Sequence, residues 1–446
     1  MVMTKVKDSF KYIFLFCFFL SLFLFFRVNN TSYDVIWEYG FSHAIRIGEV
    51  PYLDFNTICT PLYIFLMSLG LFLWDNLLVY LIEQALLCTL LFYFLFKLLG
   101  KKAWLMLFIL SFPLFQGFNG TYNFLAFFFL VVLIYLEREK KNDFYIGVVL
   151  GLLILSKHTI GIPALVLTLF PSQDIGKIIK RLLGAFVPIS IFIIYLLVTN
   201  SFHSFLDLCF LGLFDFGSKN GRGLNFFCII SIVLCLLFIF CFVRKNAKNP
   251  IYYYPIAAFF FTIPLFDYYH VQLFVGILCL FLIPYITISK IQLQKLSICL
   301  TVTTLIVINV FQGELFSLEK LGKVPHFEYY AMTSDAKKNV LNVLNQYAKY
   351  PDAVMVSNQA MFFDIATDRE ITCFSVPLYG NYGYNGTNKM ISQVKRLENQ
   401  IFFIEKLQYD KLLSTSEQLD TQLIRYIISH SERIDEVGNY YIYRKE

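Results

Sequence analysis

Two carboxylates, Asp34 and Asp54, lie in a polar and aromatic stretch at residues 28–60, directly after the first apolar segment of the chain. A carboxylate at the mouth of an apolar bundle can accept a proton from a hydroxyl or an amine as a general base. Glu38 follows Asp34 one helical turn later, and apolar residues recur at the same period on the adjoining side. We therefore predict a helix in the membrane interface whose acidic edge faces water or a cavity. A solvated loop helix with incidental acids is the alternative.

A second signal is the pair Lys157 and His158, in the middle of an otherwise apolar stretch at residues 151–167. A charge in such a stretch is costly unless it reaches an interface or a partner, so both residues are candidates for function. The alternative is a lysine whose ammonium group simply reaches the interface from the end of a short helix.

The third signal is the pair Asp267 and His270, in a short predicted turn between two apolar segments. A carboxylate three residues before a histidine can fix the orientation and protonation of the imidazole, whereas a histidine alone is more often structural. The chain contains no HExxH spacing, so the sequence does not indicate a protein-only zinc site.

A fourth candidate is the basic turn of Lys219 and Arg222, which follows an apolar run within the loop at residues 200–225. The run predicts an interfacial helix, and the turn after it suits an anionic headgroup. A plain loop explains the same residues equally well.

The elements that must position these residues are membrane helices. The chain has 446 residues, 58% hydrophobic and 15% charged, and its mean hydropathy is +0.63, which excludes a soluble globular protein. The net charge of +6 does not indicate nucleic acid, because the basic residues are distributed by membrane side. Ten cysteines, mostly in apolar runs and without metal-type spacing, predict no disulfide framework. We predict about eleven spans, at residues 10–27, 77–96, 103–118, 121–136, 144–156, 159–170, 182–199, 225–243, 252–266, 271–288 and 296–312.

The distribution of Lys and Arg supports this topology. With the N-terminus in the cytoplasm, 17 basic residues fall on the inner side and 5 on the outer side before residue 312. This 17-to-5 distribution depends on two assignments in the predicted topology. Residues 61–74 are taken to lie along or dip into the membrane, and residues 144–170 are divided at Lys157 into two short helices. We expect a multi-pass protein of the plasma (inner) membrane.

The composition changes after residue 312. Short β-like runs at residues 353–357, 400–404 and 440–443 alternate with helical stretches such as residues 335–348. We therefore predict a transmembrane catalytic domain at residues 1–324, with its first outer loop at residues 28–76. A small soluble α/β domain at residues 325–446 is expected on the extracytoplasmic side.

The topology places all the candidate residues on one side of the membrane. Acids together with cations at one bilayer face suit transfer from a lipid phosphate to a hydroxyl or an amine. A carboxylate takes the proton of the acceptor, and the cations stabilise the charge that grows on the departing phosphate. The residues in question are Asp34, Asp54, Lys157, His158, Lys219, Arg222, Asp267 and His270.

In layout, residues 10–312 resemble the GT-C membrane glycosyltransferases that use polyprenyl-phosphate sugars, including protein O-mannosyltransferases and lipid A aminoarabinose transferases. The matching features are the acid after the first span, the run GEVPYLD at residues 48–54, and Pro61 opening the next apolar segment. A glycine-rich helix ending in a lysine at residues 147–157 and the late Asp-His turn at residues 267–270 also match. The chain departs from the family where Val35, rather than a second acid, follows Asp34.

The resemblance implies roles for several residues. Asp34 would be the catalytic base, and Asp54 a second acid that positions the acceptor or a metal. Lys157 and His270 would contact the lipid phosphate. The implied partners are a polyprenyl-phosphate sugar donor, a glycan, lipid or protein acceptor, and the bilayer. The sequence does not decide whether the reaction needs a divalent cation.

Other functions are weighed against transfer. A flippase or transporter for a lipid-linked saccharide would place its charges near the midplane with repeat symmetry, whereas here the charges gather at one face without a repeat. A polysaccharide polymerase or ligase would be expected to have arginine-rich outer loops. A bundle that merely anchors the soluble domain would not need eleven spans. The sequence therefore favours an integral-membrane glycosyltransferase.

Overall fold

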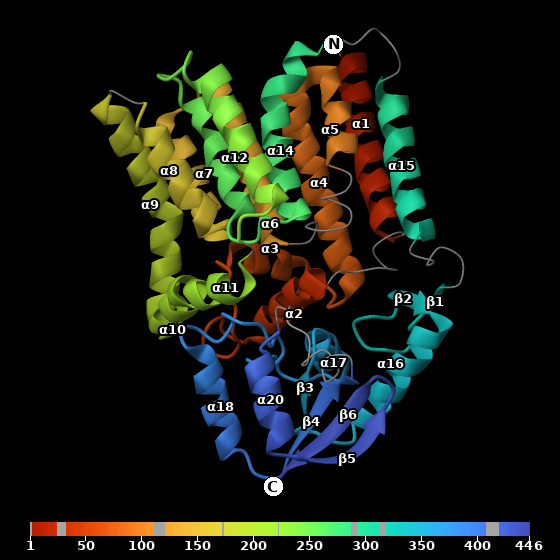
Figure 1. Ribbon diagram of the computed structural model, residues 1–446. Helices are drawn as coiled ribbons and strands as arrows, with labels where there is room; N and C mark the ends of the chain where they lie inside the picture. Colours follow the sequence, from red (N-terminus) through yellow and green to blue (C-terminus); the bar gives the residue numbers. More distant parts are fainter. Residues whose placement is uncertain are drawn as a thin grey trace.

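The computed structural model describes residues 2–24, 33–110, 121–171, 174–221, 223–286, 293–311, 318–406 and 419–446. A helical bundle forms one end of the molecule and an α/β domain forms the other, with short helices between them (Figure 1). The helices up to residue 311 are α1 (Val2–Leu22), α2 (Tyr33–Ile47), α3 (Leu62–Leu71), α4 (Leu77–Leu99), α5 (Ala103–Ile109), α6 (Tyr122–Arg138), α7 (Asp143–Ser156), α8 (His158–Leu169), α9 (Ile175–Val198), α10 (Phe202–Leu206), α11 (Gly212–Asn220), α12 (Phe226–Phe238), α13 (Tyr254–Ala258), α14 (Tyr268–Leu282) and α15 (Leu293–Phe311).

Four helical segments of the described residues are long and apolar enough to cross a membrane, at Leu77–Ile109, Ile175–Val198, Phe226–Val243 and Tyr268–Tyr285. Shorter apolar helices stand beside them, among them α7 and α8. The multi-pass helical architecture is thus present, and the count of eleven spans stays a prediction. At 10 residues, α3 is about 15 Å long and too short for a full span.

The predicted break at Lys157 is present in the structure. Lys157 has extended backbone angles, φ −155° and ψ 96°, between the last residue of α7 and the first of α8. A Cβ at Gly161 would lie 2.5 Å from backbone atoms of Ile154, so α8 packs directly against α7. At this break the Lys157 ammonium group contacts Asn123 in the first turn of α6.

Small residues allow α7 and α9 to pack closely. A Cβ at Gly147 or at Gly184 would collide with the backbone of the opposite helix, and one at Gly151 would lie 2.5 Å from the Ala185 carbonyl oxygen. Such small-residue contacts are the usual way in which membrane helices approach each other. The glycine-rich helix before Lys157 therefore forms a helix–helix contact and holds the lysine in place.

Helix α2 is more enclosed than the sequence suggests. Residues 35–44 are all buried, because α3 covers one side of the helix and α17 (Ala360–Ala366) of the C-terminal domain covers another. Gly40 allows the close approach of Met361. Trp37 Nε1 donates a hydrogen bond of 3.2 Å to the Asn358 carbonyl oxygen. The predicted interfacial helix is therefore sandwiched between the bundle and the C-terminal domain.

The C-terminal domain is a four-stranded mixed sheet with helices, in the strand order β3-β4-β6-β5 (Figure 1). β3 (Val354–Val356) runs parallel to β4 (Gln400–Glu405), with Val354 opposite Phe402. β6 (Tyr440–Lys445) pairs antiparallel with β4 and with β5 (Glu432–Val437). The remaining elements are the hairpin of β1 (Leu318–Lys320) and β2 (Ala331–Thr333), and the helices α16 (Ser334–Tyr347), α18 (Gly386–Arg396) and α20 (Thr421–Ser429).

The secondary structure of this domain confirms most of the predicted runs. β3, β4 and β6 fall on the three predicted strands, and α16 falls on the predicted helix at residues 335–348. β5 was not predicted. Its side chains are largely exposed, so it lacks the apolar alternation by which half-buried strands are recognised.

Candidate functional site

A cavity of about 430 Å³ lies where the bundle meets the C-terminal domain. It contains four of the residues that the sequence singled out: Asp34, Glu38, Asp267 and His270. The acid pair comes from α2 and the Asp-His pair from the start of α14, more than 220 residues later. The rest of the lining consists of Trp37 and Phe41, residues 57–59 and 121–123, Phe216, Phe227, Leu265, Tyr268, Tyr269, Val376, Leu378 and Asn381.

The two acids of α2 differ in environment. Asp34 is exposed in the first turn of the helix, whereas Glu38 is only 4% exposed, and its Oε2 has no hydrogen-bond partner among the described residues. Burial, and then the charge of Asp34, raise the pKa of Glu38 well above its usual range. A protonated Glu38 beside an exposed carboxylate can donate a hydrogen bond into the cavity while Asp34 accepts a proton.

Asp267 and His270 form the contact that their spacing predicts. Asp267 caps α14 by accepting a hydrogen bond of 2.9 Å from the backbone N–H of His270. The same carboxylate lies 2.8 Å and 2.9 Å from His270 Nδ1 through its two oxygens. A carboxylate on Nδ1 sets the tautomer and leaves Nε2 as the other ring nitrogen for chemistry.

Lys157 reaches the wall of this cavity. Its Nζ donates a hydrogen bond of 2.5 Å to Oδ1 of Asn123 and lies 5.1 Å from the ring centroid of Tyr122. Asn123 and Tyr122 both line the cavity. Asp267 is close enough to interact electrostatically with the ammonium group. The cation therefore stands behind an amide and an aromatic ring, on the same side as the Asp-His pair.

Part of the cavity wall belongs to the C-terminal domain. Val376, Leu378 and Asn381 line the cavity, and the Asn381 amide donates a hydrogen bond of 3.0 Å to the Val376 carbonyl oxygen. None of these three residues carries a sequence signal for function, because their position depends on how the domain docks. Sequence reasoning also missed Tyr268 and Tyr269, the aromatic residues between Asp267 and His270.

The other predicted site residues lie elsewhere. Among the described residues that line the cavity, Asp54, His158 and Lys219 are not present. The ring of His158 packs on Phe210, with ring centroids 4.8 Å apart. Lys219 lies 5.6 Å from the ring centroid of Tyr379, on the C-terminal domain. Arg222 is outside the described residues.

The Asp54 carboxylate closes a turn. Its Oδ2 accepts a hydrogen bond of 2.7 Å from the backbone N–H of Val50, and the side chain is exposed. Within this turn Tyr52 has a φ of 69°, a conformation that costs energy for any residue other than glycine. The GEVPYLD run thus forms a tightly bent loop beside the cavity.

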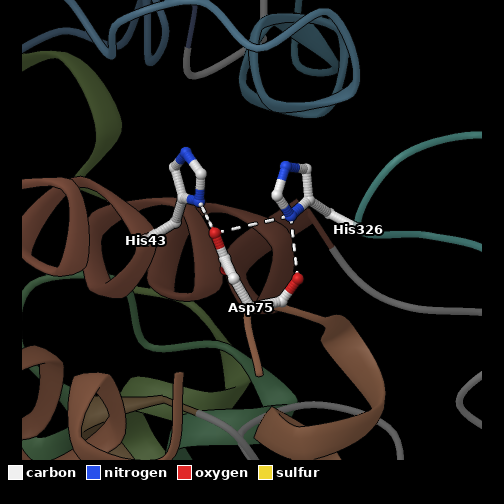
Figure 2. Close-up of side chains that lie close together, drawn as sticks. All are labelled: His43, Asp75 and His326. Carbon is white, nitrogen blue, oxygen red and sulfur yellow. Dashed lines mark hydrogen bonds and ion pairs between the residues drawn. The ribbon is translucent and has the colours of Figure 1, made fainter. Parts of the chain in front are cut away.

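One group of side chains has the composition of a metal site. His43, Asp75 and His326 offer ligand atoms within 4.8 Å of one another (Figure 2). This group includes neither Asp34 nor Asp54. Only His43 of the group belongs to α2. The acids of the cavity are therefore not part of a three-ligand cluster among the described residues.

A different arrangement of charge occupies the other end of the bundle. A cavity of about 1260 Å³ is lined by seven basic side chains, all of which the sequence assigns to the inner side. Arg181 is buried there and pairs with Glu137 and Asp143 at 2.7 Å each. The gathering of these residues at one end supports their common sidedness. They are Arg138, Lys140, Lys141, Lys177, Lys180, Arg181 and Lys248.

The fold defines the architectural class of the protein: a polytopic helical bundle that carries a small C-terminal sheet domain. The chain is similar to two crystal structures of ArnT from Cupriavidus metallidurans. With the apo state the TM-score is 0.56 at 12% identity, covering 98% of each chain. With the form bound to undecaprenyl phosphate it is 0.54 at 12% identity, covering 97% of this chain and 98% of that one. No family model matches the sequence, and no curated protein matches it.

These similarities confirm the fold that the sequence resemblance implied. They extend over the C-terminal domain as well as the bundle, because nearly the whole of both chains is covered.

Proposed function

We propose that this protein transfers a sugar from a polyprenyl-phosphate donor to an extracytoplasmic acceptor, with Asp34 as the general base. The observation that carries the proposal is the single cavity that joins the acid pair of α2 to Asp267 and His270, beside Lys157. The fold adds support, since one of the similar ArnT structures is bound to undecaprenyl phosphate.

In the proposed reaction, the acceptor oxygen or nitrogen forms a bond to the anomeric carbon as the bond from that carbon to the phosphate oxygen breaks. The acceptor proton passes to the Asp34 carboxylate, and the electron pair of the broken bond leaves on the polyprenyl phosphate. Lys157 and His270 stabilise the charge on that leaving group. Glu38, which holds its proton, orients the sugar or the acceptor by a hydrogen bond.

We also propose the membrane orientation predicted from the basic residues. The N-terminus would face the cytoplasm, and the cavity and the C-terminal domain would face the outside. This arrangement fits the proposed acceptor, which would reach the cavity from the extracytoplasmic space while the polyprenyl chain enters from the bilayer.

Mass spectrometry of lipid extracts and surface glycans tests the proposal in cells that carry wild type, Asp34→Asn or Asp352→Asn. Asp352 is an exposed aspartate of the C-terminal domain and serves as a matched control. We expect Asp34→Asn alone to accumulate one polyprenyl-phosphate sugar and to lose that sugar from a surface acceptor. Removal of a general base slows transfer by about 10²–10⁴-fold.

Unchanged lipid and glycan profiles, with the variant present at the wild-type level, would remove Asp34 as the base. If the accumulated lipid-linked sugar could not be reached by a membrane-impermeant reagent in intact cells, the result would instead support a flippase.

A further inference from the structure

Three side chains that are far apart in the sequence meet outside the candidate cavity. His43 comes from α2, Asp75 from the loop between α3 and α4, and His326 from the segment between β1 and β2. The two histidines turn Nδ1 toward Asp75, as Figure 2 shows. His43 Nδ1 lies 2.7 Å from Asp75 Oδ2, and His326 Nδ1 lies 3.4 Å from the same oxygen.

The proposed function leaves this cluster without a role. All three residues are largely shielded from solvent, with side-chain exposures of 5% for His43, 5% for Asp75 and 14% for His326. A zinc ion held at bonds of about 2.0–2.2 Å in tetrahedral geometry separates its ligand atoms by roughly 3.3 Å. At the shared oxygen the spacing is 2.7 Å for His43 and 3.4 Å for His326, and all three ligand atoms lie within 4.8 Å of one another.

The surroundings of the cluster have the form of an outer ligand shell. His326 Nε2, the ring nitrogen not directed at Asp75, lies 3.1 Å from Asp368 Oδ1. The Tyr39 hydroxyl donates a hydrogen bond of 3.3 Å to the other carboxylate oxygen, Asp75 Oδ1. Histidines that bind metals usually give their second ring N–H to a carboxylate, and ligating carboxylates are themselves hydrogen-bonded.

We propose that His43, Asp75 and His326 form a structural Zn²⁺ site that ties the C-terminal domain to the bundle. The ligands are Nδ1 of both histidines and Oδ2 of Asp75, and a water molecule completes the tetrahedron. Zinc replaces the proton between His43 Nδ1 and Asp75 Oδ2. It also replaces the 2.8 Å hydrogen bond between His326 Nδ1 and the Asp75 carbonyl oxygen.

One positive group competes with the ion. Arg46 Nη1 lies 3.3 Å from Asp75 Oδ2, and its side chain is 37% exposed. The guanidinium can therefore turn into solvent when the cation binds, at a cost in affinity. This contact separates a metal site from a purely hydrogen-bonded cluster, because only a metal site gains affinity when Arg46 is removed.

The test uses the full chain, purified in detergent with an affinity tag that contains no histidine. The protein is stripped with a chelator, and Zn²⁺ is titrated in competition with a chromophoric chelator. We expect one zinc per chain for wild type and for the control His430→Gln, whose exposed ring lies at the end of α20. His43→Gln and His326→Gln should lose the ion.

Substitutions at two exposed residues outside the ligand set still test the proposal if a ligand variant fails to fold. Asp368, whose side chain is 72% exposed, belongs to the outer shell, so Asp368→Asn should weaken zinc binding by about 10–100-fold. Arg46→Gln should strengthen it. Bound zinc should raise the unfolding temperature of wild type, since a ligand of the folded state alone stabilises that state.

The proposal is overturned if wild type holds no more zinc than the His43→Gln/His326→Gln double variant, or if Arg46→Gln and Asp368→Asn leave the zinc affinity unchanged. The measurement is zinc content and unfolding temperature, so its result is independent of whether the protein transfers a sugar.

Discussion

Buried charges occur at both ends of the bundle, and they are held in opposite ways. At the far end, Arg181 forms ion pairs of 2.7 Å with Glu137 and with Asp143. At the candidate site, Lys157 donates to the neutral amide of Asn123, and Glu38 keeps a carboxylate oxygen buried without a hydrogen-bond partner among the described residues. The first arrangement neutralises charge. The second leaves the charge of Lys157 and that carboxylate oxygen of Glu38 at the wall of a cavity.

The difference fits the proposed function, which places the reaction at the candidate site. A buried ion pair of good geometry is self-contained, and losing one partner exposes the full cost of the other. An ionisable group at the wall of a cavity costs stability, and such groups cluster at ligand-binding sites. Lys157 donates its hydrogen bond to the neutral amide of Asn123, and Asp267 interacts with the ammonium group electrostatically, so in the proposed function a lipid phosphate would add a second negative charge.

The largest expected effect on this comparison comes from Arg181→Met. The change leaves the partly buried carboxylates of Glu137 and Asp143 without their cation, and we expect a loss of up to about 3–5 kcal/mol in the stability of the folded protein. Thermal unfolding in detergent measures it. Lys180→Met is the matched control, because Lys180 is exposed one residue earlier in α9, and it should change stability by less than about 0.5 kcal/mol.

If Arg181→Met were as stable as the control, the far-end cluster would not be a structural ion pair. The contrast between the two ends would then lose its basis.

The opposite pattern is expected for Lys157→Met. In the proposed reaction Lys157 stabilises the leaving phosphate, so its removal should lower transfer by about 10²–10³-fold. Stability should stay the same or rise, because the substitution removes a buried charge whose direct hydrogen-bond partner is the neutral amide of Asn123. Glycan analysis and thermal unfolding on the same preparations check both parts, with exposed Lys141→Met as the control. Loss of folded protein in proportion to lost transfer would contradict a role in chemistry.

The sequence predicted the features of the site that depend on residues close together in the chain, such as the energetic cost of a lysine among apolar neighbours. A lysine inside an apolar stretch is expensive, and the helix does break there, between α7 and α8. The three-residue spacing of Asp267 and His270 is a local geometry, so the contact between them follows from the sequence. Asp34 and Glu38 reach one cavity because they lie one helical turn apart.

What the sequence did not predict depends on docking between distant segments. Residues 376–381 reach the cavity only because the C-terminal domain packs on α2. His43, Asp75 and His326 come together across more than 250 residues, so no motif spacing of the zinc type could have indicated them. β5 is a polar edge strand whose partner, β6, holds it through backbone hydrogen bonds. Asp54 belongs to a run that resembles a functional motif, yet its carboxylate closes a turn.

The smallest expected effect is the pH dependence of folding stability that arises from Glu38. It reports most directly on the burial of an ionisable group without an opposite charge beside it among the described residues. Burial and the neighbouring Asp34 raise the pKa of Glu38 above its value in the unfolded chain, so the folded state binds the proton more tightly. Stability should therefore fall as the pH rises above the ordinary carboxyl range, by at most about 1.4 kcal/mol per pH unit. Glu38→Gln keeps the shape and cannot ionise, so its unfolding temperature should depend less on pH between about 5 and 8 and should exceed that of wild type at the upper end. Parallel pH profiles for the two proteins would show that Glu38 is already ionised in the folded state, and the contrast between the two ends would then rest on Lys157 alone.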